Sequence, residues 1–485
     1  MSAAEQGPTT TLTGTANIPG RWRALTVSQL AAFMALLDVS IVNVALPSIE
    51  RGLGVSAGSA QWVVSGYALA FGLALVPAGR LGDAYGRRRM FMIALASFII
   101  TSALTGAAPT ITLLIVARVL QGFAGGLLIP QNTGLIQELF QGSERGRAFG
   151  VLGTTVGLAT AAGPVVGGLI ITLGSGPDAW RWVFYVNVPI GLLALVLAAR
   201  LLPAGAGGHG KVELDLVGSL MLGAGVLSLL LPLVDAESKG FAHDWWLFVI
   251  AALLLAGFAW WEGDTVRRGR VPVLDPRLVQ TRGYVAGALI GMVYFIGFTG
   301  IWLVLALYFQ DGLGYSPLRS GLAVTPFAIG VATSAAVAGR FVNRLGRVLT
   351  VSGLVATTLG LAVTALLLRH HGGDGAVWVV AVPLLVAGVG GGLVTSPNIT
   401  LSLENVPVRM AGAAGGALQT AQRVGGAIGT AVLATTFYRI LTRSHNYEQT
   451  VSDTILVAAL LMVAALAIAT TDLIHNHRHP APPHS

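Results

Sequence analysis

The chain has no cysteine and very little charge. The absence of Cys from all 485 residues excludes disulfide bonds, thiolate metal sites and thiol chemistry. Charged residues make up only 10% of the chain, where soluble domains carry roughly 25%, and hydrophobic residues make up 54%. The net charge of +8 is no sign of nucleic-acid binding, because the basic residues lie in short segments between apolar runs. The composition therefore indicates a protein that crosses the lipid bilayer many times.

The marks of an enzyme active site are also missing. The sequence has no metal-ligand spacing, no Ser, His and Asp arrangement of the hydrolytic kind, and no loop long enough for a soluble catalytic domain. The stretch Gly205–Val212 approaches an ATP-binding loop, but Val212 stands where Ser or Thr is required and no strand precedes it. The His- and Pro-rich end, His475–Ser485, is expected to be a solvated tail rather than a metal site. We therefore expect neither an enzyme nor a cofactor or metal.

Fourteen stretches are apolar and long enough to cross a bilayer, which takes about 20 residues. The sequence therefore predicts an all-α polytopic membrane protein with fourteen transmembrane helices. The predicted spans are 25–49, 61–79, 90–108, 110–136, 148–173, 182–202, 216–234, 245–261, 284–310, 320–339, 349–368, 377–403, 411–438 and 455–471.

The basic residues predict how the chain is oriented and divided. When the spans are threaded with the N-terminus inside, most Arg residues fall on the inner side, so the positive-inside rule places both termini in the cytoplasm. The loop Gly79–Arg89 after the second span recurs as Gly339–Arg347 after the tenth, which indicates duplicated six-helix bundles. The predicted parts are a disordered cytoplasmic N-terminus (1–24), a six-helix bundle (25–203), a linker with an inserted helical hairpin and a cytoplasmic connector (204–283), a second six-helix bundle (284–471) and a cytoplasmic tail (472–485).

Asp38 is a lone acid near the middle of the first predicted span. A carboxylate at that depth costs at least a few kcal/mol unless it is paired, protonated or in contact with water, so it is a candidate for proton handling. At 1.5 Å per helical residue, Asp38 lies about 20 Å from the inner end of its span and Arg118 lies about 13 Å from the outer end of the fourth. In a core about 30 Å thick these two side chains can meet. We therefore predict that Asp38 and Arg118 form the proton-coupling pair.

The loop Gly79–Arg89 (GRLGDAYGRRR) resembles the signature loop of the major facilitator superfamily. Leu37–Pro47 and Trp180–Gly191 are similar to stretches of its fourteen-helix drug–proton antiporter branch, although an interfacial aromatic belt also explains Trp180–Gly191. Ala117–Gly126 resembles the Arg-x-x-Gln-Gly motif of the family, and Gly157–Gly168 resembles the Gly-Pro motif that the family associates with antiporters. The resemblance implies multidrug or antibiotic efflux. It also implies a conformational latch (Gly79, Asp83, Gly86, Arg87, Arg88) and an antiporter Gly-Pro motif (Gly157, Gly163, Pro164, Gly167, Gly168).

A substrate cavity between the two bundles is expected near mid-depth, because transporters with repeated halves bind there. Arg423 lies at that level in the thirteenth span, and the sequence leaves open whether it pairs with an acid or contacts an anionic or polar substrate. The polar and aromatic candidates in core spans are Asn43, Tyr67, Gln121, Tyr294, Phe298, Gln419, Gln422 and Arg423.

These features together predict a proton-coupled antiporter of the cytoplasmic membrane. It would export hydrophobic drugs, antibiotics or related small organic compounds by alternating access, as a monomer and with the proton gradient as its energy source. The alternatives are a proton symporter for uptake of a small metabolite, a channel or passive facilitator, and an integral-membrane enzyme. The Gly-Pro motif disfavours uptake, and the lack of clustered acids at one interface disfavours an enzyme.

Overall fold

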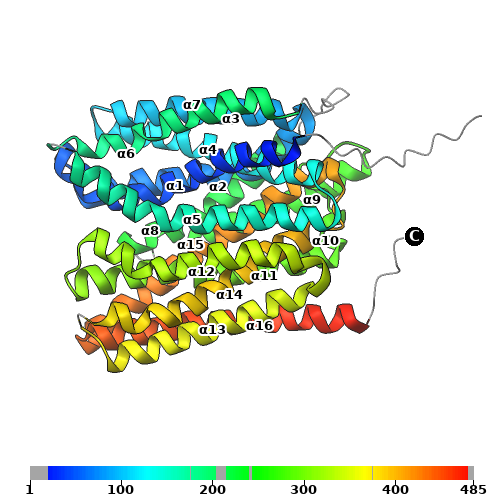
Figure 1. Ribbon diagram of the computed structural model, residues 1–485. Helices are drawn as coiled ribbons and strands as arrows, with labels where there is room; N and C mark the ends of the chain where they lie inside the picture. The colour runs from blue at the N-terminus through cyan, green and yellow to red at the C-terminus, as the bar shows by residue number, and fades with distance from the viewer. Residues whose placement is uncertain (1–19, 175, 204–214, 240–242, 374, 479–485) are drawn as a thin grey trace, which may run out of the picture.

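The computed structural model describes residues 20–174, 176–203, 215–239, 243–373 and 375–478, and within them it is built of helices and their connections (Figure 1). In the part of the chain that the structure describes, fourteen helical spans are long and apolar enough to cross a membrane. The predicted fold class, an all-α protein with fourteen transmembrane helices, is therefore confirmed.

The first half of the chain forms six spans. Five are single helices, whereas the sixth is broken between Tyr185 and Asn187, because Pro189 has no N–H to donate to the carbonyl group of Tyr185. The helices are α1 (Arg21–Leu53), α2 (Ala57–Tyr85), α3 (Arg87–Ala107), α4 (Ile111–Leu139), α5 (Gly142–Leu173), and α6 (Trp182–Tyr185) followed by α7 (Asn187–Leu201).

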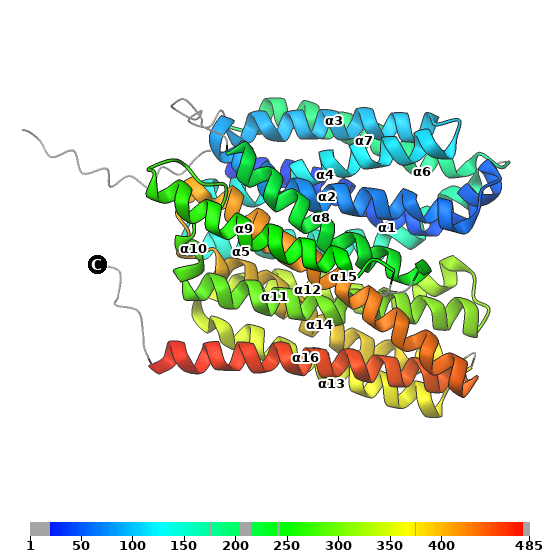
Figure 2. The same cartoon turned by 180° about the vertical axis from the view of Figure 1, so that it is seen from behind.

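Two helices separate the halves: α8 (Leu216–Lys239) and α9 (Trp246–Arg267), followed by the short α10 (Arg277–Gln280). Helix α8 packs against α2 and α15, one from each half. Its Val226 and Leu230 are buried together with Leu69 of α2, and Val424 and Ala427 of α15 lie against them. Figure 2 shows this hairpin across the back of the molecule, over the line where the halves meet.

The second half supplies the remaining six spans. Its first helix ends in a π-helical turn, Tyr308–Gly312. The helices are α11 (Arg282–Leu307), α12 (Pro317–Leu345), α13 (Arg347–His370), α14 (Ala376–Ser402), α15 (Ala411–Ser444) and α16 (Tyr447–Arg478).

Two predicted part boundaries and one predicted span end differ from the helices. Helix α1 begins at Arg21, so residues 21–24 are helical although they were expected to belong to a disordered lead-in. Helix α9 continues through Arg267, past the end of the predicted span 245–261, and α16 continues to Arg478 in the predicted tail. Both extensions have the same physical reason, since the backbone hydrogen bonds of a helix continue beyond the apolar residues into the polar segment that follows. Most of the remaining lead-in, the linker at 204–214 and the end of the tail lie outside the described residues.

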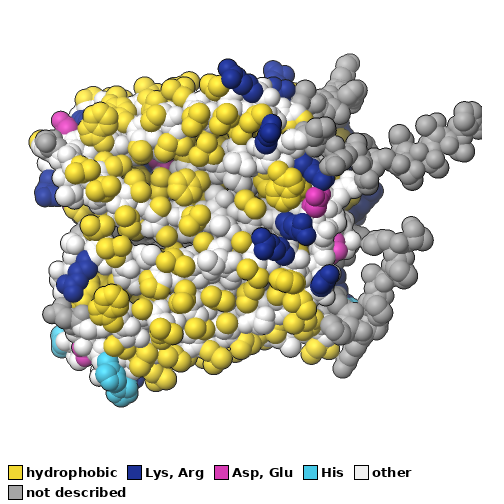
Figure 3. Space-filling model, viewed as in Figure 1, with side chains coloured by type: hydrophobic (Ala, Val, Ile, Leu, Met, Phe, Trp, Pro, Cys, Tyr) yellow, Lys and Arg dark blue, Asp and Glu magenta, His cyan; other side chains and the backbone are white. Residues whose placement is uncertain are grey.

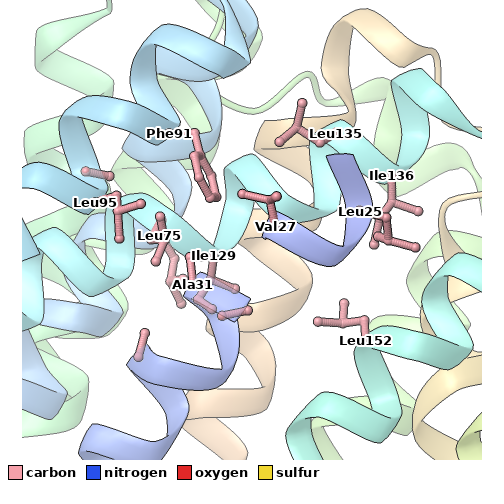
Figure 4. Packing of buried hydrophobic residues seen from close by; sticks show 14 of the residues in the cluster. Leu25, Val27, Ala31, Leu75, Phe91, Leu95, Ile129, Leu135, Ile136 and Leu152 are labelled. Atoms are coloured by element: carbon pink, nitrogen blue, oxygen red, sulfur yellow. The ribbon is translucent and has the colours of Figure 1, made fainter. Parts of the chain in front are cut away.

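The apolar side chains form two main cores and an apolar outer surface. One core lies mainly between helices of the first half and is shown in part in Figure 4, where Leu75 of α2, Phe91 of α3 and Ile129 of α4 point toward Ala31 of α1. The other core joins α11 to α16. Figure 3 shows hydrophobic side chains covering the side of the molecule, with Lys and Arg gathered toward the ends of the helices. Such a surface suits lipid around the waist and water at both ends.

The halves meet along two seams that are lined by small residues. One joins α5 to α12, and the other joins α2 to α15. A Cβ on Gly150 of α5 would lie 3.0 Å from the Ala335 carbonyl oxygen of α12, and a Cβ on Gly412 of α15 would lie 2.5 Å from the Gly79 carbonyl oxygen of α2. Glycine is needed at both places because the backbones approach too closely for a side chain.

A buried ion pair holds the second half together at the end where α16 finishes. Arg347, which begins α13, donates from Nε to Asp472 Oδ2 at 2.7 Å and from Nη1 to Asn398 Oδ1 at 2.6 Å. Both charged side chains are almost fully buried. This pair joins α13, α14 and α16.

Replacing Arg347 with Leu is therefore expected to destabilise the second half, because it leaves the carboxylate of Asp472 buried without its counter-charge. Loss of one partner of a buried pair costs about 3–5 kcal/mol. The measurement is the melting temperature of the detergent-solubilised protein. Arg369→Leu is the matched control, since the Arg369–Asp453 pair is partly exposed and such surface pairs contribute roughly 0–1 kcal/mol. Equal melting temperatures for the two variants would contradict the assignment.

Candidate functional site

Asp38 and Arg118 form an ion pair inside the first half. Arg118 Nη1 of α4 lies 2.6 Å from Asp38 Oδ2 of α1, and the two side chains are 1% and 0% exposed. The depths counted along the sequence thus predicted the contact correctly. A buried pair of this kind is electrically neutral, which lowers the cost of keeping both charges out of water.

The second oxygen of Asp38 is held by two amides. Gln121 Nε2 donates to Asp38 Oδ1 at 3.1 Å, and Asn187 Nδ2 donates to the same atom at 2.8 Å. Arg118 Nη1 also donates to Gln121 Oε1 at 2.9 Å. Asp38 is therefore held by side chains from α4 and α7, so three helices of one half converge on this carboxylate.

Arg118 is fixed by further contacts. Its Nε donates to the Val63 carbonyl oxygen of α2 at 3.1 Å. Its guanidinium carbon lies 4.1 Å from the centre of the Tyr67 ring, a distance at which a cation is attracted to the face of an aromatic ring. The Tyr67 ring in turn stacks on Phe71, with centroids 5.9 Å apart.

The predicted latch joins the two halves at the end of the molecule where α1 begins and α16 finishes, here called the latch end. Asp83 of α2 accepts hydrogen bonds from the backbone N–H groups of Gly412 and Ala413, both at 3.1 Å. These N–H groups belong to the first turn of α15, where the helix dipole favours a carboxylate. Arg87 donates to Asp83 Oδ1 at 3.0 Å and to the carbonyl groups of Gly134 and Val408.

Two other latch candidates have different surroundings. Gly86 has φ 92°, which a residue with a Cβ rarely adopts, so it makes the turn between α2 and α3. Arg88 does not reach the second half, since it donates instead to the Ala199 carbonyl oxygen of α7 at 2.6 Å. In the repeated loop, exposed Asn343 stands where Asp83 stands in the first.

Hydrogen bonds between the halves concentrate at the latch end. Besides those of Asp83 and Arg87, Gln137 Nε2 of α4 donates to the Leu403 carbonyl oxygen at 3.2 Å. Thr154 of α5 donates to Ala332 of α12 at 2.9 Å farther along the seam. Among the described residues no direct hydrogen bond links the halves at the opposite end, so the structure is closed at the latch end.

The Gly-Pro motif of α5 faces two helices. Gly163 and Gly167 lie against Ser40 and Ile41 of α1, while Gly157, Pro164 and Gly168 lie against α12 of the other half. A Cβ on Gly157 would lie 2.9 Å from the Ala332 backbone nitrogen. The motif thus packs α5 between the Asp38-bearing helix and the second half.

The predicted substrate-cavity residues do not form one set. Gln121 is fully buried on Asp38, and Tyr67 is buried beneath Arg118, so both belong to the ion-pair network. Tyr294 and Phe298 stack at 5.3 Å within an aromatic cluster that also contains Phe295, Trp302 and Phe327. Asn43 is exposed in the part of α1 farthest from the latch end.

The remaining candidates, Gln419, Gln422 and Arg423, share one face of α15. All three are partly exposed. The guanidinium carbon of Arg423 lies 4.5 Å from the centre of the Phe71 ring of α2, so this side chain reaches across to the first half.

Sequence reasoning missed Asn187 and the hydroxyl groups behind it. Asn187 Nδ2 also lies 3.1 Å from Ser102 Oγ, and Thr105 Oγ1 donates to Gln121 Oε1 at 3.3 Å. Asn187 lies in the stretch Trp180–Gly191, whose aromatic residues draw attention to the membrane interface. The available signal was an Asn in an otherwise apolar span, since such residues usually bond across helices.

Comparison with known proteins agrees with this arrangement. The chain is 38% identical over 440 residues to a puromycin resistance protein of Streptomyces alboniger, covering 90% of this chain and 83% of the relative. It is 36% identical over 439 residues to a probable actinorhodin transporter of Streptomyces coelicolor, covering 90% and 75%. The structure of a proton:xylose symporter superposes with a TM-score of 0.68 at 16% identity, covering 94% of this chain and 96% of that one.

The sequence pattern of the family described as the Major Facilitator Superfamily matches residues 30–430, most of the length of the chain. Members of this family are transporters rather than enzymes, which agrees with fourteen apolar helices and places the protein in the cell membrane as a multi-pass component. The chain belongs to the Major Facilitator Superfamily.

Proposed function

We propose that the protein is a proton-coupled antiporter that exports small hydrophobic organic compounds across the cytoplasmic membrane. The observation that carries the proposal is the neutral, fully buried Asp38–Arg118 pair in the middle of a transporter fold. The direction of transport is supported by the relatives, which include a puromycin resistance protein and a tetracenomycin C resistance and export protein.

Asp38 is the proton carrier in this proposal. Protonation removes the negative charge from the ion pair and leaves Arg118 as an uncompensated cation. Keeping that unpaired cation buried costs free energy, and this cost favours a change of conformation when Asp38 binds a proton.

Rocking of the halves alone does not separate this pair. Asp38, Arg118 and Asn187 all belong to the first half, so a rigid-body movement carries them together. The coupling therefore depends on local movement of α1 or on a change in the hydration of Asp38. Helix α1 has little room to move on one side, because the glycines of α5 lie directly against its Ser40 and Ile41.

In this proposal, alternating access depends on the hydrogen bonds between the two halves, which are concentrated at one end of the molecule. The structure is closed at the latch end, which the positive-inside rule places in the cytoplasm together with both termini. Opening toward the cytoplasm requires Asp83 to release the first turn of α15. The protein acts as a monomer in this scheme, because both halves of the pathway come from one chain.

Asp38→Asn is expected to abolish proton-driven transport, because the amide cannot carry a proton between the two sides. In energised everted vesicles the wild type accumulates Nile red, a neutral hydrophobic dye, and an uncoupler prevents the accumulation. The variant is expected to bind the dye without accumulating it. Asp178→Asn is the matched control, since Asp178 is an exposed acid paired only with Arg181 near the end of α5.

The same assay distinguishes export from uptake. Proton symport for uptake, the alternative function, would drive the dye out of acidified everted vesicles rather than into them. Full proton-driven accumulation by Asp38→Asn would show that another group carries the proton and would overturn the proposal.

Asp83→Asn is expected to open the latch end, because the neutral amide bonds less strongly to the N–H groups of α15. A hydrogen bond to a charged group contributes about 1.5–3 kcal/mol, so the population of the open state should rise several-fold. The measurement is the distance distribution between spin labels at Ser143→Cys and Asn405→Cys, exposed positions of the two halves.

The chain contains no Cys, so the labels need no background of cysteine replacements. Asp178→Asn again provides the control. An unchanged distance distribution in Asp83→Asn would show that Asp83 does not hold the latch end closed.

A further inference from the structure

Arg423 differs from the other arginines that lie inside the helical bundle. Arg87, Arg118 and Arg347 each form an ion pair with a buried aspartate, namely Asp83, Asp38 and Asp472. Arg423 has no carboxylate within ion-pair distance among the described residues, although it lies well inside α15. The alternative that Arg423 is a structural partner for an acid is thereby removed.

Two side-chain amides lie near Arg423 and add hydrogen-bonding groups to its positive charge. Gln419 and Gln422 lie four and one residues before it, and at this spacing Gln419 shares its face of α15 directly. Both amides are partly exposed and have no hydrogen-bond partner among the described residues. The guanidinium rests 4.5 Å from the Phe71 ring, which leaves N–H groups at its edge to donate elsewhere.

A cationic ligand would find no counterpart at this level. Both oxygens of Asp38 are already occupied, Oδ2 by Arg118 and Oδ1 by Gln121 and Asn187. The charge near the seam is therefore the positive charge of Arg423, which rests on the buried Phe71 ring. Such a charge, with its remaining N–H groups, suits an apolar compound that carries a negative group.

We propose that Arg423 is the anion-recognition residue of the substrate site, with the Gln419 and Gln422 amides assisting, and that the exported compounds include hydrophobic aromatic anions. The proposal rests on the export function proposed above and adds the charge of the substrate. Export of an anion in exchange for a proton moves the equivalent of two positive charges inward per cycle, so an inside-negative membrane potential favours it.

The test compares two probes that share one ring system, pyrene-1-sulfonate and pyrene-1-methylammonium. Binding of each to the full-length protein in lipid nanodiscs is measured by equilibrium dialysis, with empty nanodiscs subtracted. The wild type is expected to prefer the sulfonate. Arg423→Gln should weaken sulfonate binding at least about tenfold, the loss of one charged hydrogen bond, and leave the ammonium probe unchanged or tighter.

Arg423→Lys keeps the charge and is expected to retain most of the sulfonate affinity, which separates charge recognition from a folding defect. Arg369→Gln, at an exposed surface pair, is the control for a change of net charge. Equal binding of both probes by the wild type, or an equal loss of both in Arg423→Gln, would overturn the proposal.

The binding measurement tests the anion site and the vesicle assay tests the antiport, so each proposal can be contradicted without the other. If the wild type selects the sulfonate but exchanges nothing for protons, only the proposed antiport is wrong. If Nile red transport is proton-driven but Arg423→Gln binds the sulfonate normally, only the anion site is wrong.

Discussion

The rest of the structure depends on one fully buried ion pair, between Asp38 and Arg118. Asp38 is fully buried, and an isolated carboxylate would be unstable there. Arg118, Gln121 and Asn187 supply the donors that replace water, and they come from α4 and α7, so the packing of three helices is tied to the state of one side chain. The contacts of this one side chain therefore tie α1, α4 and α7 together.

The second constraint is the close approach of the two halves. Glycines on α5, α12, α2 and α15 bring backbones together where no side chain fits. Apolar side chains gain little from leaving lipid for another helix, so association inside the membrane relies on such close packing and on hydrogen bonds. Asp83 adds hydrogen bonds between the halves at the latch end, so the contacts between the halves are distributed unevenly along the seam.

The sequence alone predicted the helices and the depth of the charged residues, because span length and helical rise are fixed by geometry. The depths of Asp38 and Arg118 were matched in this way. The sequence did not predict which way each helix faces. Gln121 was expected beside a substrate but lies against Asp38, and Arg88 was expected in the latch but lies against α7.

The reason is that these helices are apolar around most of their circumference, so the pattern that reveals the buried face of a soluble helix is weak. Asn187 illustrates the same limit, since its partner Asp38 lies 149 positions away along the chain. Only the rotation of α7 about its axis, set by packing against α1 and α3, brings the two together.

The hairpin of α8 and α9 has a consequence for compounds dissolved in the bilayer. Leu69, Val226 and Leu230 form one apolar patch over the meeting line of α2 and α15, and Val76 and Phe258 form another nearer the latch end. This flank is screened from lateral diffusion out of the lipid, so access from this side is blocked. Because lipid tails replace such contacts at little cost, the packing of α8 shields the flank while adding little to the attachment of the two halves to each other.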